Sequence, residues 1–367
     1  MFRLLVSAGG TGGSVYPALA VVPALAGKAD VTWLGGQGGM EADLVARAGV
    51  PFEAIPAAGV HGVGLSALPG NLARLSRGYL AARRAVRRLR PDVVLLTGGY
   101  VGVPVAFAAR HVPQLAFVPD LEPGLALRAM GLTADVIALS VEEARRFYPG
   151  RRRVVVTGYP VRPDLRPIER GEARARLGLH PRDEVLLVMG GSRGARALNE
   201  ALWGCLEKVL GFAEVVHLTG ELDFPRRQSV RQTLPPRLAD RYHAFAYLHE
   251  EMAWALSAAD LVLSRAGASV LGEYPRFGLP AVLVPYPHAW RYQRRNAEYL
   301  AGRGAAIVLR ERDLAGRLPD TLLELLRDPA RLQHMADKAR QLAVPGAAHA
   351  IADELEGLAR RAAGRHD

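Results

Sequence analysis

The amino-acid sequence predicts an α/β protein built from two doubly wound parallel-sheet domains. Short apolar runs alternate along the chain with segments of helical periodicity, and this alternation is typical of parallel sheets covered by helices on both faces. The pattern runs through once and starts again after a connector that holds two prolines and a glycine. A chain of 367 residues also exceeds one ordinary α/β core and suits two domains.

The first domain starts with a strand at 3–7, a glycine turn at 8–13 and a helix at 15–25. The other strands expected in it are 31–34, 52–55, 93–97, 114–118, 136–139 and 154–156. In the second domain the expected strands are 185–189, 214–218, 243–245, 261–264, 281–284 and 306–309.

The connector Thr157–Pro163 sets the domain boundary, because its prolines and glycine suit neither a helix nor a strand. We therefore expect one domain at 1–158 and a second at 159–344. The end of the chain, 314–363, is helical and rich in alanine, leucine and arginine. Its last helix, about 345–367, can pack back on the first domain.

Composition excludes several classes of protein. Half of the residues are apolar and 23% are charged, which is ordinary for a globular protein and argues against disorder. The longest apolar stretch, 15–26, contains two prolines and is shorter than the ~20 residues that span a bilayer. Because no signal peptide is recognisable either, we expect a cytoplasmic protein. The single cysteine, Cys205, excludes an internal disulfide and a thiolate zinc cluster, and we expect it to be a small buried side chain.

The formal net charge of +11 is compatible with nucleic acid, an anionic membrane surface or a phosphorylated substrate. Arginines concentrate at 70–90, interleaved with apolar residues at helical spacing, which predicts a basic amphipathic helix. An exposed surface helix in an arginine-rich chain is the alternative. No basic groove with interleaved aromatic residues is apparent, so nucleic-acid binding is disfavoured. The arginines are Arg74, Arg77, Arg83, Arg84, Arg87, Arg88 and Arg90, and the apolar residues are Leu72, Leu75, Tyr79, Leu80 and Val86.

Glycine turns follow four of the expected strands, at 9–13, 98–102, 190–194 and 265–269. Such a turn at the start of a helix exposes backbone amides that favour a phosphate. A single turn often serves only a tight corner, but two in each half favour a nucleotide ligand. An NAD site is disfavoured because the second strand ends at Gly35–Gly36, where that fold needs an acidic residue. A P-loop is disfavoured because none of the three lysines, at 28, 208 and 338, lies in one of these glycine turns.

Four segments of the second half, 190–199, 264–273, 278–280 and 293–296, resemble the donor-nucleotide domain of glycosyltransferase family 28, the MurG family. The first half agrees at 9–13, 40–45, 98–101 and 158–162, so the resemblance covers nearly the whole chain and is more specific in its second half. It implies a GT-B fold, with two Rossmann-like domains facing a central cleft. It also implies an inverting N-acetylglucosaminyltransferase of peptidoglycan synthesis. Such an enzyme transfers GlcNAc from UDP-GlcNAc to a muramoyl-pentapeptide polyprenyl diphosphate and so converts lipid I to lipid II. The reaction is expected at the cytoplasmic face of the membrane.

The resemblance implies roles for donor-side residues. Glu273 is expected to accept hydrogen bonds from the ribose hydroxyls, while Ser192 and the amides of Gly191 and Arg193 hold the diphosphate. Arg162 adds a cation, Arg265 assists, and the uracil lies near Leu248 and His249. Gln293 and Asn296 match sugar-contacting positions, and Tyr292 replaces a glutamine of the family. The other implied donor-side residues are Thr11, Gly12, Gly13, Gly267, Ala268 and Ser269, and Gly10 and Tyr100 are expected on the acceptor side.

No metal or other cofactor is expected, because helix amides and arginine can stabilise the charge on the departing diphosphate. Asp120 and Glu122 resemble the acidic pair of metal-dependent transferases, but they belong to the first domain, away from the expected diphosphate.

The sequence departs from the family on the acceptor side. The family has a histidine after the first glycine turn, where this chain has Ser14, and a serine hydroxyl alone is not a base. The family's His-Glu-Gln-Asn run is replaced by 119–124, about two residues shorter. We predict that Asp120 or Glu122 is the base and group Ser14 with them as catalytic. Alternatively, Glu122 caps the helix that begins near Pro123.

Three other functions stay open. A related GT-B enzyme with the same donor domain would glycosylate another lipid or a small natural product. An epimerase of UDP-GlcNAc would share the fold and the nucleotide, and a nucleic-acid-binding protein would share only the charge. Lipid I remains the expected acceptor because the basic segment 70–90 suits peripheral attachment to an anionic inner membrane surface.

Overall fold

The computed structural model describes residues 1–10, 12–57, 68–150, 153–191, 194–288 and 291–364. The chain divides into two compact units, which are described separately. Unit 1 comprises 1–163 and 344–367, and unit 2 comprises 164–343. Of the expected site residues, Thr11, Ser192 and Arg193 lie outside the described part of the chain.

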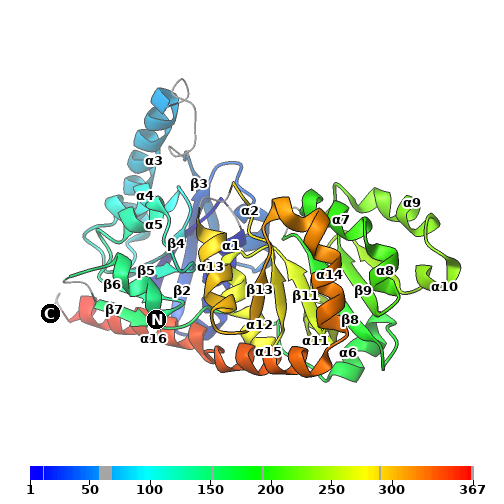
Figure 1. Cartoon of the computed structure of the whole chain (residues 1–367). Coiled ribbons are helices and arrows are strands. Elements are labelled where there is room, and N and C mark those ends of the chain that lie inside the picture. The colour runs from blue at the N-terminus through cyan, green and yellow to red at the C-terminus, as the bar shows by residue number, and fades with distance from the viewer. Residues whose placement is uncertain (11, 58–67, 151–152, 192–193, 289–290, 365–367) are drawn as a thin grey trace. The chain divides into compact units, whose positions relative to one another are not determined.

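Among the described residues of unit 1, the strands form a seven-stranded parallel sheet in the order β3-β2-β1-β4-β5-β6-β7 (Figure 1). The central strands β4, β5 and β6 are buried along their whole length, as expected for apolar strands covered on both faces. The strands are β1 (Phe2–Ala8), β2 (Ala29–Gly36), β3 (Phe52–Ile55), β4 (Val93–Gly98), β5 (Gln114–Val118), β6 (Val136–Leu139) and β7 (Arg153–Val156).

The helices of unit 1 follow its strands and include a long basic helix and the last helix of the chain. They are α1 (Gly12–Val21), α2 (Glu41–Arg47), α3 (Leu68–Leu89), α4 (Gly102–Ala108), α5 (Leu125–Met130) and α16 (Ala347–Ala363), with 3-10 helices η1 (Val22–Leu25) and η3 (Glu142–Phe147).

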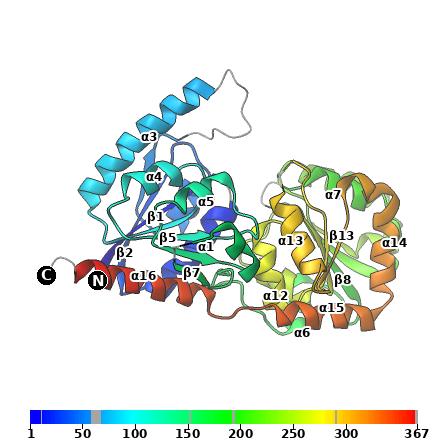
Figure 2. The same cartoon turned by 60° about the vertical axis from the view of Figure 1, so that its left-hand side comes forward.

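Helix α16 returns to unit 1 after the chain has completed unit 2. It contacts α1, β4 and β5 and runs past the N-terminal end of the chain in both cartoon views (Figures 1 and 2). Ion pairs of Lys28 with Glu356, at 2.7 Å, and of Arg153 with Glu354, at 2.6 Å, accompany this contact.

The connector belongs to unit 1. The amides of Thr157 and Gly158 both donate to the carbonyl of Leu139, at 3.0 and 3.2 Å. Gly158 has φ +81 and leaves no room for a side chain, since a Cβ there would lie 2.5 Å from Val344. The two units divide at 163/164. The boundary expected from the prolines and glycine was 158/159.

In unit 2, the strands that the structure describes form a six-stranded parallel sheet in the order β10-β9-β8-β11-β12-β13. These strands are β8 (Glu184–Met189), β9 (Ala213–Leu218), β10 (Tyr242–Phe245), β11 (Leu261–Ser264), β12 (Ala281–Leu283) and β13 (Ala306–Val308). The helices are α6 (Arg170–Leu177), α7 (Arg196–Trp203), α8 (Leu206–Leu210), α9 (Arg227–Gln232), α10 (Pro236–Ala239), α11 (Met252–Ala258), α12 (Glu273–Phe277), α13 (Tyr292–Ala301), α14 (Leu314–Leu326) and α15 (Pro329–Gln341), with 3-10 helices η4 (Phe224–Arg226), η5 (Ala268–Leu271) and η6 (Glu311–Asp313).

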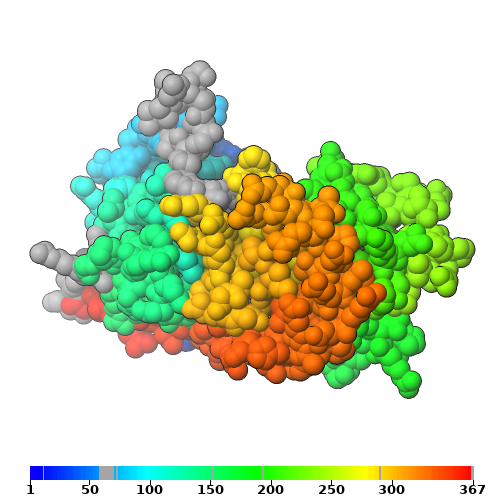
Figure 3. Space-filling model, viewed as in Figure 1, coloured from blue at the N-terminus to red at the C-terminus, as the bar shows by residue number. Residues whose placement is uncertain are grey.

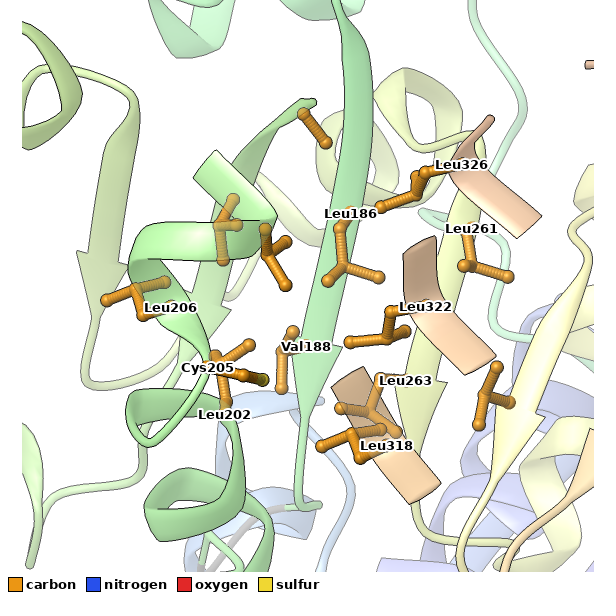
Figure 4. Packing of buried hydrophobic residues seen from close by; sticks show 14 of the residues in the cluster. Leu186, Val188, Leu202, Cys205, Leu206, Leu261, Leu263, Leu318, Leu322 and Leu326 are labelled. Carbon is orange, nitrogen blue, oxygen red and sulfur yellow. The ribbon is translucent and has the colours of Figure 1, made fainter. Parts of the chain in front are cut away.

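The core of unit 2 lies between its sheet and α7, α8 and α14. Leucines of α14 and of α7 point at side chains of the central strands β8 and β11 (Figure 4). The space-filling view shows the orange surface of α14 covering this face of the unit (Figure 3). Leu318 and Leu322 of α14 are fully buried, because α14 carries its leucines at helical spacing on the face toward the sheet.

Candidate functional site

The four glycine turns lie at the topological switch points of the two sheets. In unit 1 the chain order reverses between β1 and β4, and in unit 2 it reverses between β8 and β11. The turns 9–13 and 98–102 follow β1 and β4, and the turns 190–194 and 265–269 follow β8 and β11. In open parallel sheets, ligands bind outside the carboxyl ends of the strands at such a point. Each unit therefore has its own candidate binding edge.

The two turns of unit 1 are packed against each other. A Cβ on Gly99 would lie 2.1 Å from the carbonyl oxygen of Gly9, and Gly99 has φ +80. The ring of Tyr100 covers Gly10, since a Cβ on Gly10 would lie 3.4 Å from that ring. Gly10 and Tyr100, both expected on the acceptor side, are thus adjacent.

A buried carboxylate that the sequence analysis did not assign holds the first turn. Glu41, at the start of α2, is 1% exposed and accepts hydrogen bonds from the amides of Gly10, at 3.2 Å, and Gly36, at 2.8 Å. A Cβ on Gly9 or Gly39 would lie 2.3 Å from its oxygens. The sequence contained one signal for this contact. A pair of glycines ends each of two expected strands, and an acidic residue follows the second pair shortly afterwards.

Ser14, near the start of α1, bonds to the same turn. Its hydroxyl donates to the carbonyl of Gly9 at 2.8 Å, and its own carbonyl accepts from the hydroxyl of Thr97 at 2.5 Å. The side chain is buried. Ser14 therefore joins the turn after β1 to the end of β4.

The carboxylate pair follows β5, at the same edge of the sheet as the two turns. Glu122 has a side chain that is 5% exposed and pairs with Arg128 of α5 at 3.4 Å, and Arg128 also donates to the carbonyl of Pro123 at 3.1 Å. Helix α5 begins at Leu125, with Gly124 at the N-cap position. Asp120 is only partly buried.

In unit 2, the turn after β8 is a tight glycine loop. Gly191 and Gly194 have φ +92 and +75, and the amide of Gly194 donates to the carbonyl of Gly191 at 2.9 Å. Helix α7 begins only at Arg196, so the loop is followed directly by a helix N-terminus, where amides lack intrahelical partners.

Gln293 and Asn296 hold the turn after β11. The side-chain oxygen of Gln293 accepts from the amides of Ala266, at 3.3 Å, and Tyr286, at 2.9 Å. Asn296 is 0% exposed and donates to the carbonyl of Ala266 at 3.2 Å. Both residues were expected near the sugar, and both are bonded to the backbone of this turn.

Glu273 begins a new helix. The segment before it is the 3-10 helix η5, and Gly272 separates η5 from α12 as the N-cap of α12. Gly267 is the N-cap of η5, and Ala268 and Ser269 are its first residues. Glu273 is thus partly buried at the first position of α12.

The remaining expected residues have local contacts. Arg265 pairs with Glu311 and donates to the carbonyl of Val284 at 3.2 Å. The guanidinium of Arg162 lies 4.9 Å from the centre of the Tyr16 ring, a cation–π contact within unit 1. Near the expected uracil, Leu248 is buried and His249 is exposed, and Tyr292 is the first residue of α13.

Among the described residues, no group of three histidine, cysteine, aspartate or glutamate side chains is arranged to hold a metal ion. No helix in the described part of the chain is long and apolar enough to cross a membrane.

Comparison with known proteins assigns the family. The model of the glycosyltransferase family 28 N-terminal domain matches residues 4–135, and that of the family's C-terminal domain matches residues 185–351. The chain belongs to glycosyltransferase family 28. A relative from Roseiflexus sp. is 40% identical over 98% of this chain and 95% of its own length. It is named UDP-N-acetylglucosamine--N-acetylmuramyl-(pentapeptide) pyrophosphoryl-undecaprenol N-acetylglucosamine transferase.

Solved structures agree with this family. The crystal structure of Acinetobacter baumannii MurG is 30% identical, with a TM-score of 0.77 over 97% of this chain and 100% of that chain. A UDP-GlcNAc 2-epimerase from Neisseria meningitidis bound to UDP-GlcNAc has a TM-score of 0.67 over 97% of this chain and 100% of that chain, but is only 12% identical and shows the fold alone. The predicted fold class of two Rossmann-like parallel-sheet domains and the predicted glycosyltransferase class are confirmed.

Proposed function

We propose that this member of family 28 transfers GlcNAc from UDP-GlcNAc to a muramyl pentapeptide carried on pyrophosphoryl-undecaprenol. The names of its full-length relatives support this activity. The observation that carries it is the pair of glycine turns at the switch point of each sheet. One binding edge per unit suits a reaction with two substrates.

The donor is assigned to unit 2. Amides of the loop 190–195 and the start of α7 bind the diphosphate and stabilise the negative charge that develops on departing UDP. Ser192 and Arg193 add polar and cationic groups, and the Glu273 carboxylate accepts hydrogen bonds from the ribose hydroxyls. His249 lies near the uracil. No metal ion takes part in this proposal.

Gln293 and Asn296 serve the donor through the turn after β11. Because Asn296 has no exposed surface and both side chains bond to Ala266, they act as positioning residues for Gly267, Ala268 and Ser269.

Direct displacement with inversion needs a base that removes the proton of the acceptor hydroxyl as the oxygen attacks the anomeric carbon and UDP leaves. Asp120 is proposed as this base. Glu122 is less suited because its buried carboxylate is paired with Arg128, and the hydroxyl of Ser14 is already bonded to Gly9. Gly10 and Tyr100 border the acceptor.

Peripheral attachment to an anionic membrane surface is proposed for α3. A shallow apolar groove of about 460 Å³ lies between α3 and α4 and includes Leu80 and Phe107, of which Leu80 is 50% exposed. Arg83, Arg84 and Arg87 are exposed on the same helix. Apolar side chains beside arginines suit the headgroup region of anionic lipids on the cytoplasmic face.

The test is a transfer assay with purified protein, UDP-GlcNAc and a lipid I analogue. We expect release of UDP that depends on that acceptor, with one GlcNAc joined to it for each UDP released. Transfer to diacylglycerol or a phenol instead would assign the alternative, a family 28 enzyme with another acceptor. Release of UDP from the donor alone would indicate an epimerase and contradict the proposal.

A further inference from the structure

A chain of polar side chains, half-buried at Trp203 and otherwise buried, crosses unit 2 from the end of α7 to the loop that follows β9. Its members are joined by hydrogen bonds of 2.8–2.9 Å and lie on α7, β9, β10 and the loop after β9. They are Trp203, Tyr242, His217, Asn199 and Asp223.

The direction of every hydrogen bond in this chain follows from its two ends. The indole N–H of Trp203 can only donate, so it donates to the Tyr242 oxygen, and the Tyr242 hydroxyl donates to Nδ1 of His217. Nε2–H of His217 then donates to the side-chain oxygen of Asn199. Burial lowers the pKa of His217 to about 3, so the imidazole is neutral. Its proton is assigned to Nε2 because the Asn199 amide nitrogen faces two acceptors, which leaves the Asn199 oxygen to accept from the ring.

The amide group of Asn199 therefore has one favourable orientation. Its Nδ2 donates to the carbonyl of Thr219 at 2.8 Å and to the carboxylate of Asp223 at 2.9 Å. If the amide were flipped, its nitrogen would face the N–H of His217 and its oxygen would face two acceptors. The Nε2–H of His217 therefore favours the same orientation as the two acceptors and supplies the donor for the Asn199 oxygen.

The Thr219 carbonyl is in contact with the donor loop. A Cβ on Gly194 would lie 2.5 Å from this oxygen, so the loop after β8 rests directly on it. The second oxygen of Asp223 accepts from Nε of Arg196 at 3.3 Å, at the first position of α7. One end of the polar chain thus contacts the C-terminal end of the loop 190–195, through Gly194 and Arg196.

We propose that His217 is a positioning residue for the donor loop and acts through the amide of Asn199. This inference rests on the proposed function, because it assigns the loop 190–195 to UDP. His217 touches neither substrate, and its ring is fully buried. Its contribution is to hold Asn199, and through it the Thr219 carbonyl, in the place that the closed glycine turn requires.

The test compares three substitutions by calorimetric UDP binding, thermal unfolding and steady-state kinetics. His217→Phe keeps a ring and removes the donor to Asn199, so we expect the Kd of UDP and the KM of UDP-GlcNAc to rise about tenfold, the size of one lost hydrogen bond. His217→Gln places an amide nitrogen near the position of Nε2, and it should restore most of the affinity. Tyr242→Phe removes the bond at Nδ1 and the acceptor of the Trp203 N–H but leaves the bond from His217 to Asn199, so it is the control for lost buried polarity.

A structural role alone would make the loss of UDP affinity follow the loss of Tm in all three variants. The inference is supported if His217→Phe and Tyr242→Phe lower the Tm similarly while only His217→Phe weakens UDP binding. Equal Kd values in both variants would overturn it. If His217→Phe does not fold, Asn199→Asp keeps the acceptor for His217, loses the donor to Thr219 and Asp223 and places a second carboxylate beside Asp223. It should weaken UDP binding, and unchanged binding in that variant would overturn the inference. Wild-type protein that binds no UDP would instead contradict the proposed function and remove the basis of the inference with it.

Discussion

The carboxylate of Glu41 accepts a hydrogen bond from the backbone amide of Gly10 at 3.2 Å, although the two residues lie 31 positions apart. The same carboxylate accepts from the amide of Gly36 at 2.8 Å. An acidic side chain of the protein thus occupies the space between the ends of β1 and β2. The Glu41 carboxylate therefore binds the glycine turn after β1 on the side that faces β2.

Replacing Glu41 tests this arrangement. In Glu41→Gln, one buried amide N–H would face an –NH₂ group and lose its acceptor, so we expect a loss of about 1–3 kcal/mol in the free energy of unfolding. Transfer activity should fall as well. Urea unfolding measures the first effect, with Glu53→Gln as the control, because Glu53 forms only a surface ion pair with Arg88 worth about 0–1 kcal/mol. Equal stability of the two variants would contradict the role of Glu41.

Asp120→Asn tests the proposed base. Loss of a general base reduces kcat by about 10²–10⁴-fold, and the KM of UDP-GlcNAc should change little. Glu122→Gln should mainly reduce stability, since it removes the carboxylate partner of Arg128. Steady-state kinetics at saturating donor, together with thermal unfolding, separates the two effects. A normal kcat in Asp120→Asn would show that the base lies elsewhere.

Membrane attachment through α3 is tested by removing Arg83, Arg84 and Arg87 together as glutamines. Each arginine near an anionic surface contributes ~1 kcal/mol. The affinity for anionic vesicles, measured by sedimentation, should therefore fall about a hundredfold. The control removes three exposed arginines of unit 2, Arg182, Arg310 and Arg317, with the same change in net charge. Similar losses in both variants would mean that total charge, and not α3, determines binding.

Cys205 should be unreactive in the folded protein. Burial raises the pKa of its thiol to about 11, so at pH 8 only about one thiol in a thousand is the reactive thiolate. We expect no labelling by iodoacetamide in native buffer and complete labelling in denaturant, as followed by mass spectrometry. Rapid native labelling would show that the segment between α7 and α8 opens readily.

His217 should make stability depend on pH. Its pKa in the folded protein, about 3, is below its ordinary value of 6.5, so between these values the unfolded chain binds more protons than the folded protein. The free energy of unfolding should therefore fall as the pH drops from 6.5, by up to about 1.4 kcal/mol per pH unit from this residue. Urea midpoints at several pH values measure it, and the difference between wild type and His217→Gln isolates it. Parallel pH profiles for the two proteins would argue against a buried neutral His217.

The strands were predictable because each is a short apolar run between glycine or proline signals. The runs at 52–55, 114–118 and 136–139 agree with β3, β5 and β6 to the residue. Their order in the sheets, and hence the switch points, depends on long-range pairing that no local pattern contains. For the same reason the pairing of Glu41 with Gly10 and Gly36 was not foreseen.

The expected site residues were found from a resemblance, which gives positions but not contacts. Asn296 looks like a polar residue available to a ligand, yet it is buried against Ala266 because α13 packs beside η5. The sequence shows His217 as a polar residue near the end of a mostly apolar strand, and its partners Asn199 and Tyr242 lie on other elements.

The return of α16 to unit 1 has a consequence for synthesis of the chain. A ribosome delivers all of residues 164–343, a contiguous segment, before it delivers the helix that covers β4 and β5. Ile351, Leu355 and Leu358 of α16 are buried in the finished protein, so their counterparts on unit 1 stay uncovered during most of translation. Synthesis of unit 1 thus begins first and ends last. Unit 2 is able to fold before the final helix of unit 1 has been synthesised.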